Sequence, residues 1–192
     1  FVGGETLTLF HRFSVGEIRQ GMLQPPAELL DSLAARLSEA IEREPAKYEW
    51  YLARGEVLNI KAAAFNDQAA FEAARSDVEK ATSLAQNVPR VWYAKGTIFL
   101  GLGRCNNNPP ASPALCDEGI AAFKKAVELN PDLADSYWTL GNAYHFVGND
   151  KDADAAYSKA LDLGYSVELP SEAQALIDVF SKTHNFPREE IG

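Results

Sequence analysis

The 192-residue sequence contains few of the residue types that build catalytic or metal centres. It has two cysteines and three histidines, and the histidines lie far apart in the sequence. It contains no HExxH, no CxxC and no glycine-rich phosphate loop, and no motif pairs a serine or cysteine with a histidine and an acid. We therefore expect no catalytic residue, no metal and no cofactor, although a site assembled only in three dimensions would escape this test.

Long apolar runs and an excess of positive charge are also lacking. No window approaches 18 consecutive apolar residues, so we expect no membrane-spanning segment. The 18 Lys and Arg against 27 Asp and Glu leave a formal net charge of −9, which disfavours nucleic acid and anionic membranes as partners. No targeting pattern follows Phe1, so any such segment is expected to be cleaved or to lie outside this sequence.

The sequence does contain enough apolar material for one folded domain, with 46% hydrophobic and 23% charged residues. Its segment 134–163, ADSYWTLGNAYHFVGNDKDADAAYSKALDL, places small residues beside aromatic ones. The aromatic positions are Tyr137, Tyr144 and Tyr157, and the small ones are Gly141, Ala153 and Ala160. Small residues let two helices approach closely, and the rings fill the space beside the contact. The pattern resembles the tetratricopeptide repeat, a helix–turn–helix of 34 residues.

The same pattern recurs, less closely, in two earlier segments. One copy contains Trp92, Gly96, Phe99 and Gly103 with Phe123, Ala126 and Pro131, and the other contains Tyr51, Gly55 and Leu58 with Ala74, Val78 and Ala81. A half copy, with Leu37, Ala40 and Pro45, predicts a helix from about Pro26 to Glu44. The resemblance implies an all-α fold, a right-handed superhelical stack of antiparallel helix hairpins with about three full repeats after a half repeat.

The resemblance divides the chain into three parts. Residues 25–185 form the repeat domain, which a capping helix from Pro170 to about Ser181 is expected to close, and residues 186–192 form a tail. Residues 1–24 form an extended N-terminal arm, in which 5–10 alternates polar and apolar residues. This segment is either an extended or unstructured tail or an arm that docks on another subunit. The residues of such a self-association arm would be Leu7, Leu9, Phe10 and Phe13.

Spacing locates two insertions in the earlier copies. Compared with the last copy, Gly55–Ala74 carries about seven extra residues and Gly103–Gly119 carries eleven. The second insertion includes the polar and proline-rich segment 106–115, which is predicted not to be helical.

Cys105 and Cys116 flank that segment. If the chain re-enters the repeat at a tight turn, the two residues fall near the roughly 5.5 Å Cα separation that a disulfide needs. We predict this disulfide and, with it, an extracytoplasmic location in the periplasm or at the cell surface. The alternative is two free thiols in a cytoplasmic protein, and no further Cys or His lies close by to favour metal ligation.

One sequence pattern resembles a calcium site. Asp150, Asp152 and Asp154 match the start of an EF-hand loop, but the sixth position is Ala155 instead of glycine and the twelfth is Leu161 instead of glutamate. The repeat register places these aspartates at the start of a helix, where negative charge is stabilising. We therefore predict a helix start and no metal.

The resemblance also implies a concave groove that receives an extended peptide or a helix. Its lining positions correspond to Glu49, Leu52, Glu56 and Asn59; Arg90, Tyr93, Thr97 and Leu100; and Asp135, Trp138, Asn142 and His145. Tyr93 and Trp138 are typical anchors, and the two asparagines suit a peptide backbone. Alternatively, Tyr93 and Trp138 pack beneath the next helix. The fifth and ninth positions hold no basic residue, which disfavours the carboxylate clamp of chaperone-binding members.

Together these features predict a non-catalytic protein-interaction or assembly module that is exported and binds a protein or peptide. One form of it self-associates as a homo-oligomer or an extracellular filament. The alternatives are a cytoplasmic adaptor that binds a peptide or helix of a different protein and, less favoured, an enzyme whose site is not visible in the sequence.

Overall fold

The computed structural model describes residues 25–107 and 110–165 of the chain. The helices are α3 (Ala27–Arg43), α4 (Tyr48–Phe65), α5 (Gln68–Leu84), α6 (Pro89–Leu102), α7 (Pro113–Leu129), α8 (Ala134–Phe146) and α9 (Asp150–Asp162). These described ranges contain no strand. The expected N-terminal arm, capping helix and tail lie outside the described residues.

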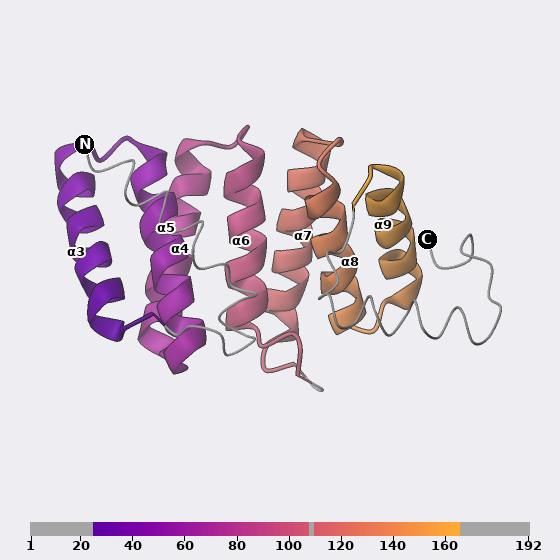
Figure 1. The fold of residues 1–192 in the computed structure, drawn as a ribbon, viewed down its shortest axis with the longest axis horizontal. Helices are drawn as coiled ribbons and strands as arrows, with labels where there is room; N and C mark the ends of the chain where they lie inside the picture. Colours follow the sequence, from indigo (N-terminus) through magenta and orange to yellow (C-terminus); the bar gives the residue numbers. More distant parts are fainter. Residues whose placement is uncertain (1–24, 108–109, 166–192) are drawn as a thin grey trace, which may run out of the picture.

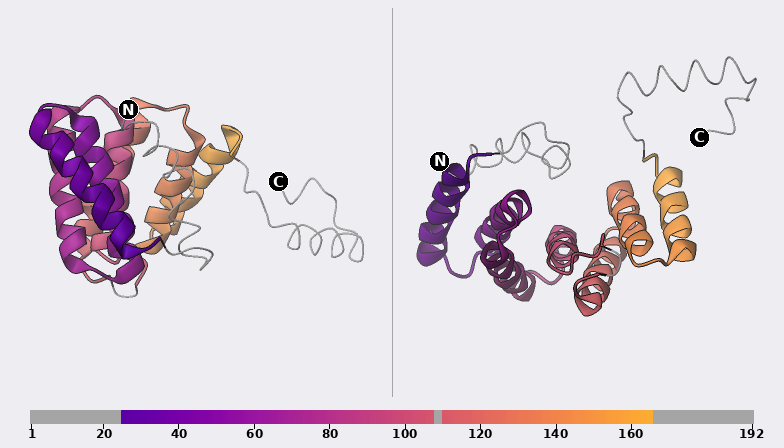
Figure 2. Two further views of the ribbon diagram at one scale, coloured as in Figure 1. Left: turned by 60° about the vertical axis from the view of Figure 1, so that its left-hand side comes forward. Right: turned by 90° about the horizontal axis from the view of Figure 1, so that it is seen from below.

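The helices form a stack of antiparallel hairpins that curves along its length (Figures 1 and 2). The hairpins α4–α5, α6–α7 and α8–α9 follow one another, and α3, at the place of the predicted half repeat, packs on α4. The prediction of an all-α helical-repeat solenoid is confirmed. None of the described helices is long and apolar enough to cross a membrane.

Local sequence explains where the helices begin and end. The side chain of Asp67 accepts a hydrogen bond from the backbone N–H of Ala70 and caps α5. Asn149 caps α9 in the same way through Asp152, so the aspartates of the EF-hand-like segment lie in the first turns of a helix. Gly148 in the preceding turn has a φ of 75°, which favours glycine.

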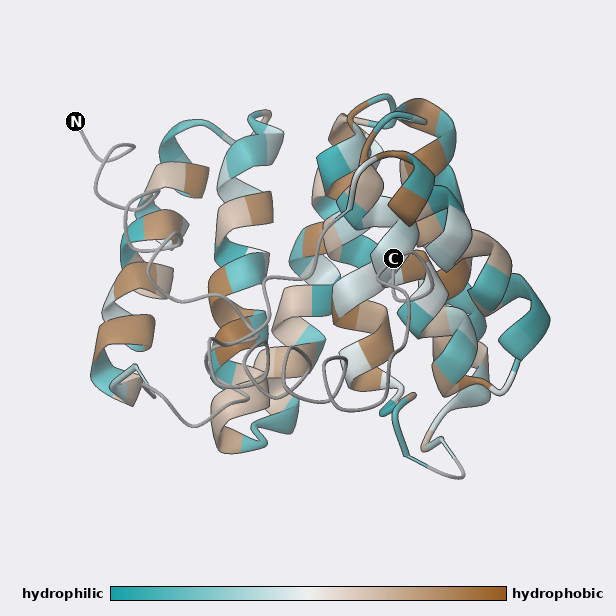
Figure 3. Cartoon of the chain, turned by 45° about the vertical axis from the view of Figure 1, so that its right-hand side comes forward, coloured by the Kyte–Doolittle hydropathy of each residue, from teal (hydrophilic) through white to brown (hydrophobic). Residues whose placement is uncertain are grey.

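The core consists of rings seated on small residues, as the repeat pattern predicts. Phe123 of α7 is fully buried, and a Cβ at Gly96 of α6 would lie only 2.7 Å from its ring. The corresponding pair in the last hairpin is Gly141 with Tyr157. Apolar residues, brown in Figure 3, are interspersed with hydrophilic ones along each helix. The small-beside-large pattern therefore sets how closely the two helices of a hairpin approach.

The two insertions are accommodated differently. In the first full repeat the helices themselves are longer, 18 residues for α4 and 17 for α5 against 13 each for α8 and α9. In the second repeat most of the extra residues form a loop over 103–112, and the rest lengthen α7, which has 17 residues. The prediction that 106–115 is not helical is wrong for its last three residues, because α7 begins at Pro113. Proline is tolerated there because an N–H in the first turn has no helical acceptor.

Because the helices alternate in direction, one edge of the stack collects the beginnings of α3, α5, α7 and α9. The turn 66–67, the loop 103–112 and the turn 147–149 all lie along this edge, at the bottom of Figure 1. We call it the turn edge.

Candidate functional site

The predicted groove residues lie on the first helices of the three hairpins, α4, α6 and α8. Glu49, Arg90, Asp135 and His145 are exposed, whereas Glu56, Tyr93, Thr97, Leu100, Trp138 and Asn142 are half-buried. Leu52 and Asn59 are buried and present almost no surface to a partner. Leu52 packs in the core, and the carboxamide of Asn59 lies beside Gly101 of α6.

Polar pairs connect neighbouring repeats across this face. Arg90 of α6 donates to Glu56 of α4, with the closer oxygen at 3.0 Å. The hydroxyl groups of Tyr93 on α6 and Thr139 on α8 are 3.1 Å apart. Burial raises the pKa of the Glu56 carboxyl, and the opposing attraction of Arg90 offsets only part of this effect. These four side chains therefore help to hold the repeats in register.

Trp138 is partly covered by its own chain. Its ring stacks on Tyr165 with centroids 4.5 Å apart and lies 4.7 Å from the ring of Tyr157. The Tyr157 hydroxyl donates to Oδ1 of Asn142 at 2.8 Å. Desolvation raises the pKa of the Tyr157 and Tyr165 hydroxyl groups. The sequence did not indicate Tyr165. The contact with Tyr157 places Trp138 against α9, the next helix, as the alternative interpretation of this residue describes.

A small cavity of about 170 Å³ lies between α6 and α8. Its lining includes three of the predicted groove residues, Thr97, Leu100 and Asn142, together with Thr139 and Phe146. It offers hydroxyl and amide groups next to apolar surface, which suits a polypeptide segment better than a charged small molecule.

A larger cleft continues from this cavity to the turn edge, because both are lined by Asn106 and Phe146. We call it the turn-edge cleft; its volume is about 710 Å³, and it is lined by Asn106, Asn107, Pro110, Pro113, Asp117, His145, Phe146, Val147 and Gly148. Of these residues the groove prediction included only His145. The eleven-residue insertion was the available signal, since it supplies one wall.

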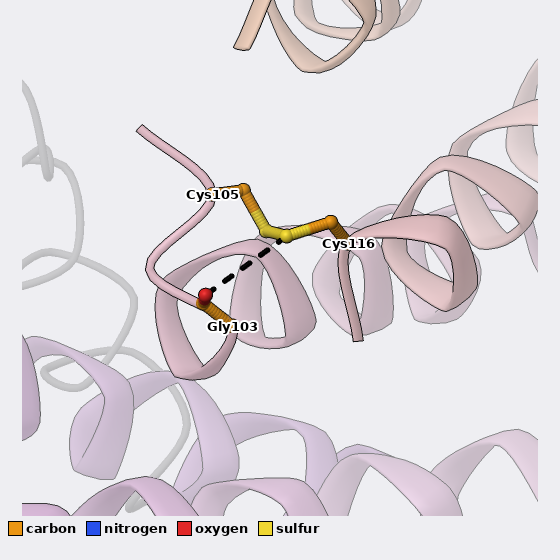
Figure 4. The surroundings of a disulfide bond; sticks show 3 residues. All are labelled: Gly103, Cys105 and Cys116. Atoms are coloured by element: carbon orange, nitrogen blue, oxygen red, sulfur yellow. Dashed lines mark hydrogen bonds between the residues drawn. A yellow bond between two sulfur atoms is a disulfide. The ribbon is translucent and has the colours of Figure 1, made fainter. Parts of the chain in front are cut away.

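That wall is anchored by a disulfide between Cys105 and Cys116, whose Cα atoms are 5.7 Å apart. Both residues are fully buried. The backbone of the loop closes on itself where Ser112 N donates to Gly103 O at 3.0 Å, and the Sγ atom of Cys116 lies 3.9 Å from the same oxygen (Figure 4). A Cβ at Gly103 would lie 2.9 Å from Sγ of Cys105, so this position requires glycine.

The described residues include no group of three or more His, Cys, Asp or Glu side chains that could hold a metal ion. Within the EF-hand-like segment, Asp150 is 3.1 Å from Nδ1 of His145, and Asp152 accepts from the amide of Asn149. Their carboxylates thus have local partners at the start of α9.

Comparisons with known proteins identify the repeats. Residues 117–148 match a family model described as TPR repeat, and residues 134–163 match one described as Tetratricopeptide repeat. The human protein O-mannosyl-transferase TMTC1 is 27% identical over 139 residues, which cover 70% of this chain. The chain spans only 14% of the length of that relative.

A solved structure of MamA shares the fold. The structure described as MamA MSR-1 C2 is 17% identical with a TM-score of 0.53, and the likeness covers 82% of this chain and 84% of that one. MamA from Desulfovibrio magneticus RS-1, residues 41 to the end, is 18% identical with a TM-score of 0.43, covering 86% and 99%. Residues 117–163 of this all-helical stack therefore contain tetratricopeptide repeats.

Proposed function

We propose that the chain is a non-catalytic assembly module that binds a polypeptide along the concave face of α4, α6 and α8, outside the cytoplasm. Tetratricopeptide repeats are protein-interaction modules, and this chain contains them. The observation that carries the proposal is the cavity between α6 and α8, where three of the predicted groove residues meet.

The chemistry of this cavity suits a peptide backbone. Asn142 has two amide N–H donors besides the oxygen that accepts from Tyr157. Leu100 supplies apolar surface beside it, and the Thr97 hydroxyl is a further polar group on the same helix. A segment lying between α6 and α8 would therefore find both hydrogen-bonding groups and an apolar floor.

The buried disulfide supports the extracytoplasmic location. Disulfides persist in oxidising compartments and are rare where thiols are kept reduced. Cys105 and Cys116 are fully buried and close the loop at its base, as expected of a disulfide that stabilises the fold. Mass measurement after alkylation of protein from its native source tests this: two free thiols would favour the cytoplasmic adaptor instead.

Self-association is the form of assembly that we propose, with the arm residues Leu7, Leu9, Phe10 and Phe13 as its contacts. An extended terminal segment that docks on a neighbouring copy joins subunits at low cost, and a head-to-tail contact that does not close generates a filament. Electron microscopy of the full chain and of a chain lacking residues 1–24 tests this. Filaments or oligomers should depend on the arm.

A second candidate is favoured by the human relative, which is named as a protein O-mannosyl-transferase. In this candidate the repeats hold a polypeptide acceptor for a transferase domain that is a separate part of a larger protein. Incubating the chain with an activated mannose donor and a serine- and threonine-containing peptide tests whether the chain is catalytic by itself. Transfer of mannose by the chain alone would contradict the non-catalytic proposal.

Site-specific cross-linking tests the groove directly. A photo-reactive amino acid at Thr97, on α6 in the cavity, should trap a polypeptide in cells of the native source. The matched control is Glu79, an exposed residue of α5 outside both cavities. Adducts of equal yield at both positions, or none at Thr97, would contradict binding in the groove.

A further inference from the structure

We propose that the turn-edge cleft is the receptor for the N-terminal arm of a second copy of this chain, with Arg12 of the arm next to Asp117 of the cleft. This inference rests on the self-association proposed above and names the surface that performs it. The cleft lies outside the twelve predicted groove positions, apart from His145, and the insertion of the second repeat creates it.

Apolar side chains form part of the cleft's surface. Phe146 and Val147 are 37% and 36% exposed at the end of α8, and Pro110 and Pro113 line the same cleft. A single exposed apolar residue is ordinary on a protein surface. Two adjacent exposed apolar residues that share a cleft of about 710 Å³ with two prolines form a surface suited to apolar side chains.

The charge of the cleft specifies the complement. Its described lining contains no Lys or Arg, and neither does the lining of the adjoining cavity. Asp117 is the carboxylate of that lining, it is exposed, and it lies on the disulfide wall next to Cys116. Asp150, paired with His145, adds negative charge nearby. An occupant with apolar residues beside a cation would match this surface.

The N-terminal arm has this composition. Its stretch Leu7–Phe13, LTLFHRF, combines four large apolar residues with His11 and Arg12 and contains no acid. In an extended segment, alternate side chains point the same way, so Phe10 and Arg12 share one face. Phe10 would then contact Phe146 and Val147 while Arg12 pairs with Asp117.

The length of the arm allows it to reach a second copy. The arm precedes Pro25, and α3 begins at the turn edge, where the cleft also lies. The eleven residues 14–24 reach about 40 Å when fully extended. That reach is long enough for the segment 7–13 to leave its own stack and enter the cleft of a neighbouring copy, which is the arrangement that the proposed self-association requires.

Exchanging the two charges tests the pairing in the full-length chain. We expect the wild-type chain to self-associate in sedimentation velocity, and Arg12→Glu or Asp117→Arg alone to weaken the association about tenfold by placing like charges together. Mixing the two variants should restore assembly, because each mixed contact then pairs opposite charges. This rescue requires arm and cleft to come from different copies. Glu118→Arg is the matched control, since it makes the same charge change one residue along α7 and does not line the cleft.

Each outcome decides a separate point. A wild-type chain that stays monomeric overturns the self-association itself, and the cleft assignment with it. If the wild type assembles but Asp117→Arg and Glu118→Arg behave alike, self-association stands and the cleft is the wrong receptor. Failure of the mixture to recover would overturn the pairing of Arg12 with Asp117. Circular dichroism of each variant establishes that the helices are intact.

Discussion

The ring of Phe123 on α7 rests against the backbone of Gly96 on α6, so closely that a Cβ on the glycine would lie within 2.8 Å of three ring carbons. Tyr157 and Gly141 have the same relationship in the last hairpin, at 2.5 Å. These contacts set the spacing between the two helices of each of these hairpins.

Gly96→Ala should destabilise the fold more than Gly141→Ala. Phe123 is fully buried and has no room to move, whereas Tyr157 is only half-buried and can shift outward. Overpacking costs about 1–3 kcal/mol, and the helix propensity gained from alanine returns up to about 1 kcal/mol. Urea denaturation of both variants measures this. Equal stability of Gly96→Ala and wild type would mean that the contact is not a close one.

Loss of the disulfide should lower the free energy of unfolding by about 3 kcal/mol, since it closes a loop of about a dozen residues. The double variant Cys105→Ala/Cys116→Ala should therefore melt below the wild type in calorimetry. Wild type reduced under denaturing conditions and refolded in reductant should match it. If the reductant also lowered the melting temperature of the double variant, the difference would not come from this bond.

Asp77→Ala should be among the most destabilising single changes. Arg54 of α4 donates to both carboxylate oxygens of Asp77 on α5 at 2.7 Å and to Ser38 of α3 at 2.8 Å, which joins three helices. The Asp77 side chain is 5% exposed and that of Arg54 25%, and removing one partner of such a largely buried ion pair costs about 3 kcal/mol. Replacing both by apolar residues, as in Arg54→Met/Asp77→Leu, should recover much of this loss. Chemical denaturation of the single and double variants distinguishes pairing from packing.

Glu56→Gln should have a higher free energy of unfolding than wild type. This difference should grow as the pH rises above the pKa of glutamate in the unfolded chain. Burial raises the folded-state pKa of Glu56, whose side chain is 23% exposed, so the folded protein binds more protons than the unfolded one between the two pKa values. Stability due to this group is therefore lost as the pH rises through that window.

Denaturation of wild type and Glu56→Gln at pH 4 and pH 7 measures this difference. The control variant is Glu49→Gln, an exposed glutamate in the first turn of the same helix. A larger gain for Glu56→Gln at pH 4 than at pH 7 would contradict the direction of the pKa shift.

Much of the fold could be predicted because each repeat carries its packing instructions locally. The placement of Gly141, Tyr144 and Tyr157 predicts one hairpin, and the structure shows it as α8 and α9. The half repeat likewise predicts a helix from about Pro26 to Glu44, and α3 covers Ala27–Arg43. Such patterns are readable because close helix contacts demand small residues at fixed intervals.

The candidate site was less predictable, because it depends on contacts between segments far apart in the sequence. Family positions placed Leu52 and Asn59 in the groove, but the core and the neighbouring α6 bury them. Tyr165 covers Trp138 from beyond the last described helix. No local pattern around Phe146 or Val147 reveals that they face the disulfide loop.

The sequence by itself determined the helical hairpins, their order and the two cysteines that flank the insertion, since these depend on residues within one repeat. Only the tertiary structure decided that the first repeat accommodates its extra residues in its helices, whereas the second places most of them in a loop. It also decided which groove side chains remain accessible. The physical reason is that accessibility depends on how neighbouring repeats pack. That packing brings together side chains that are far apart in the sequence, and no periodic pattern predicts which of them meet.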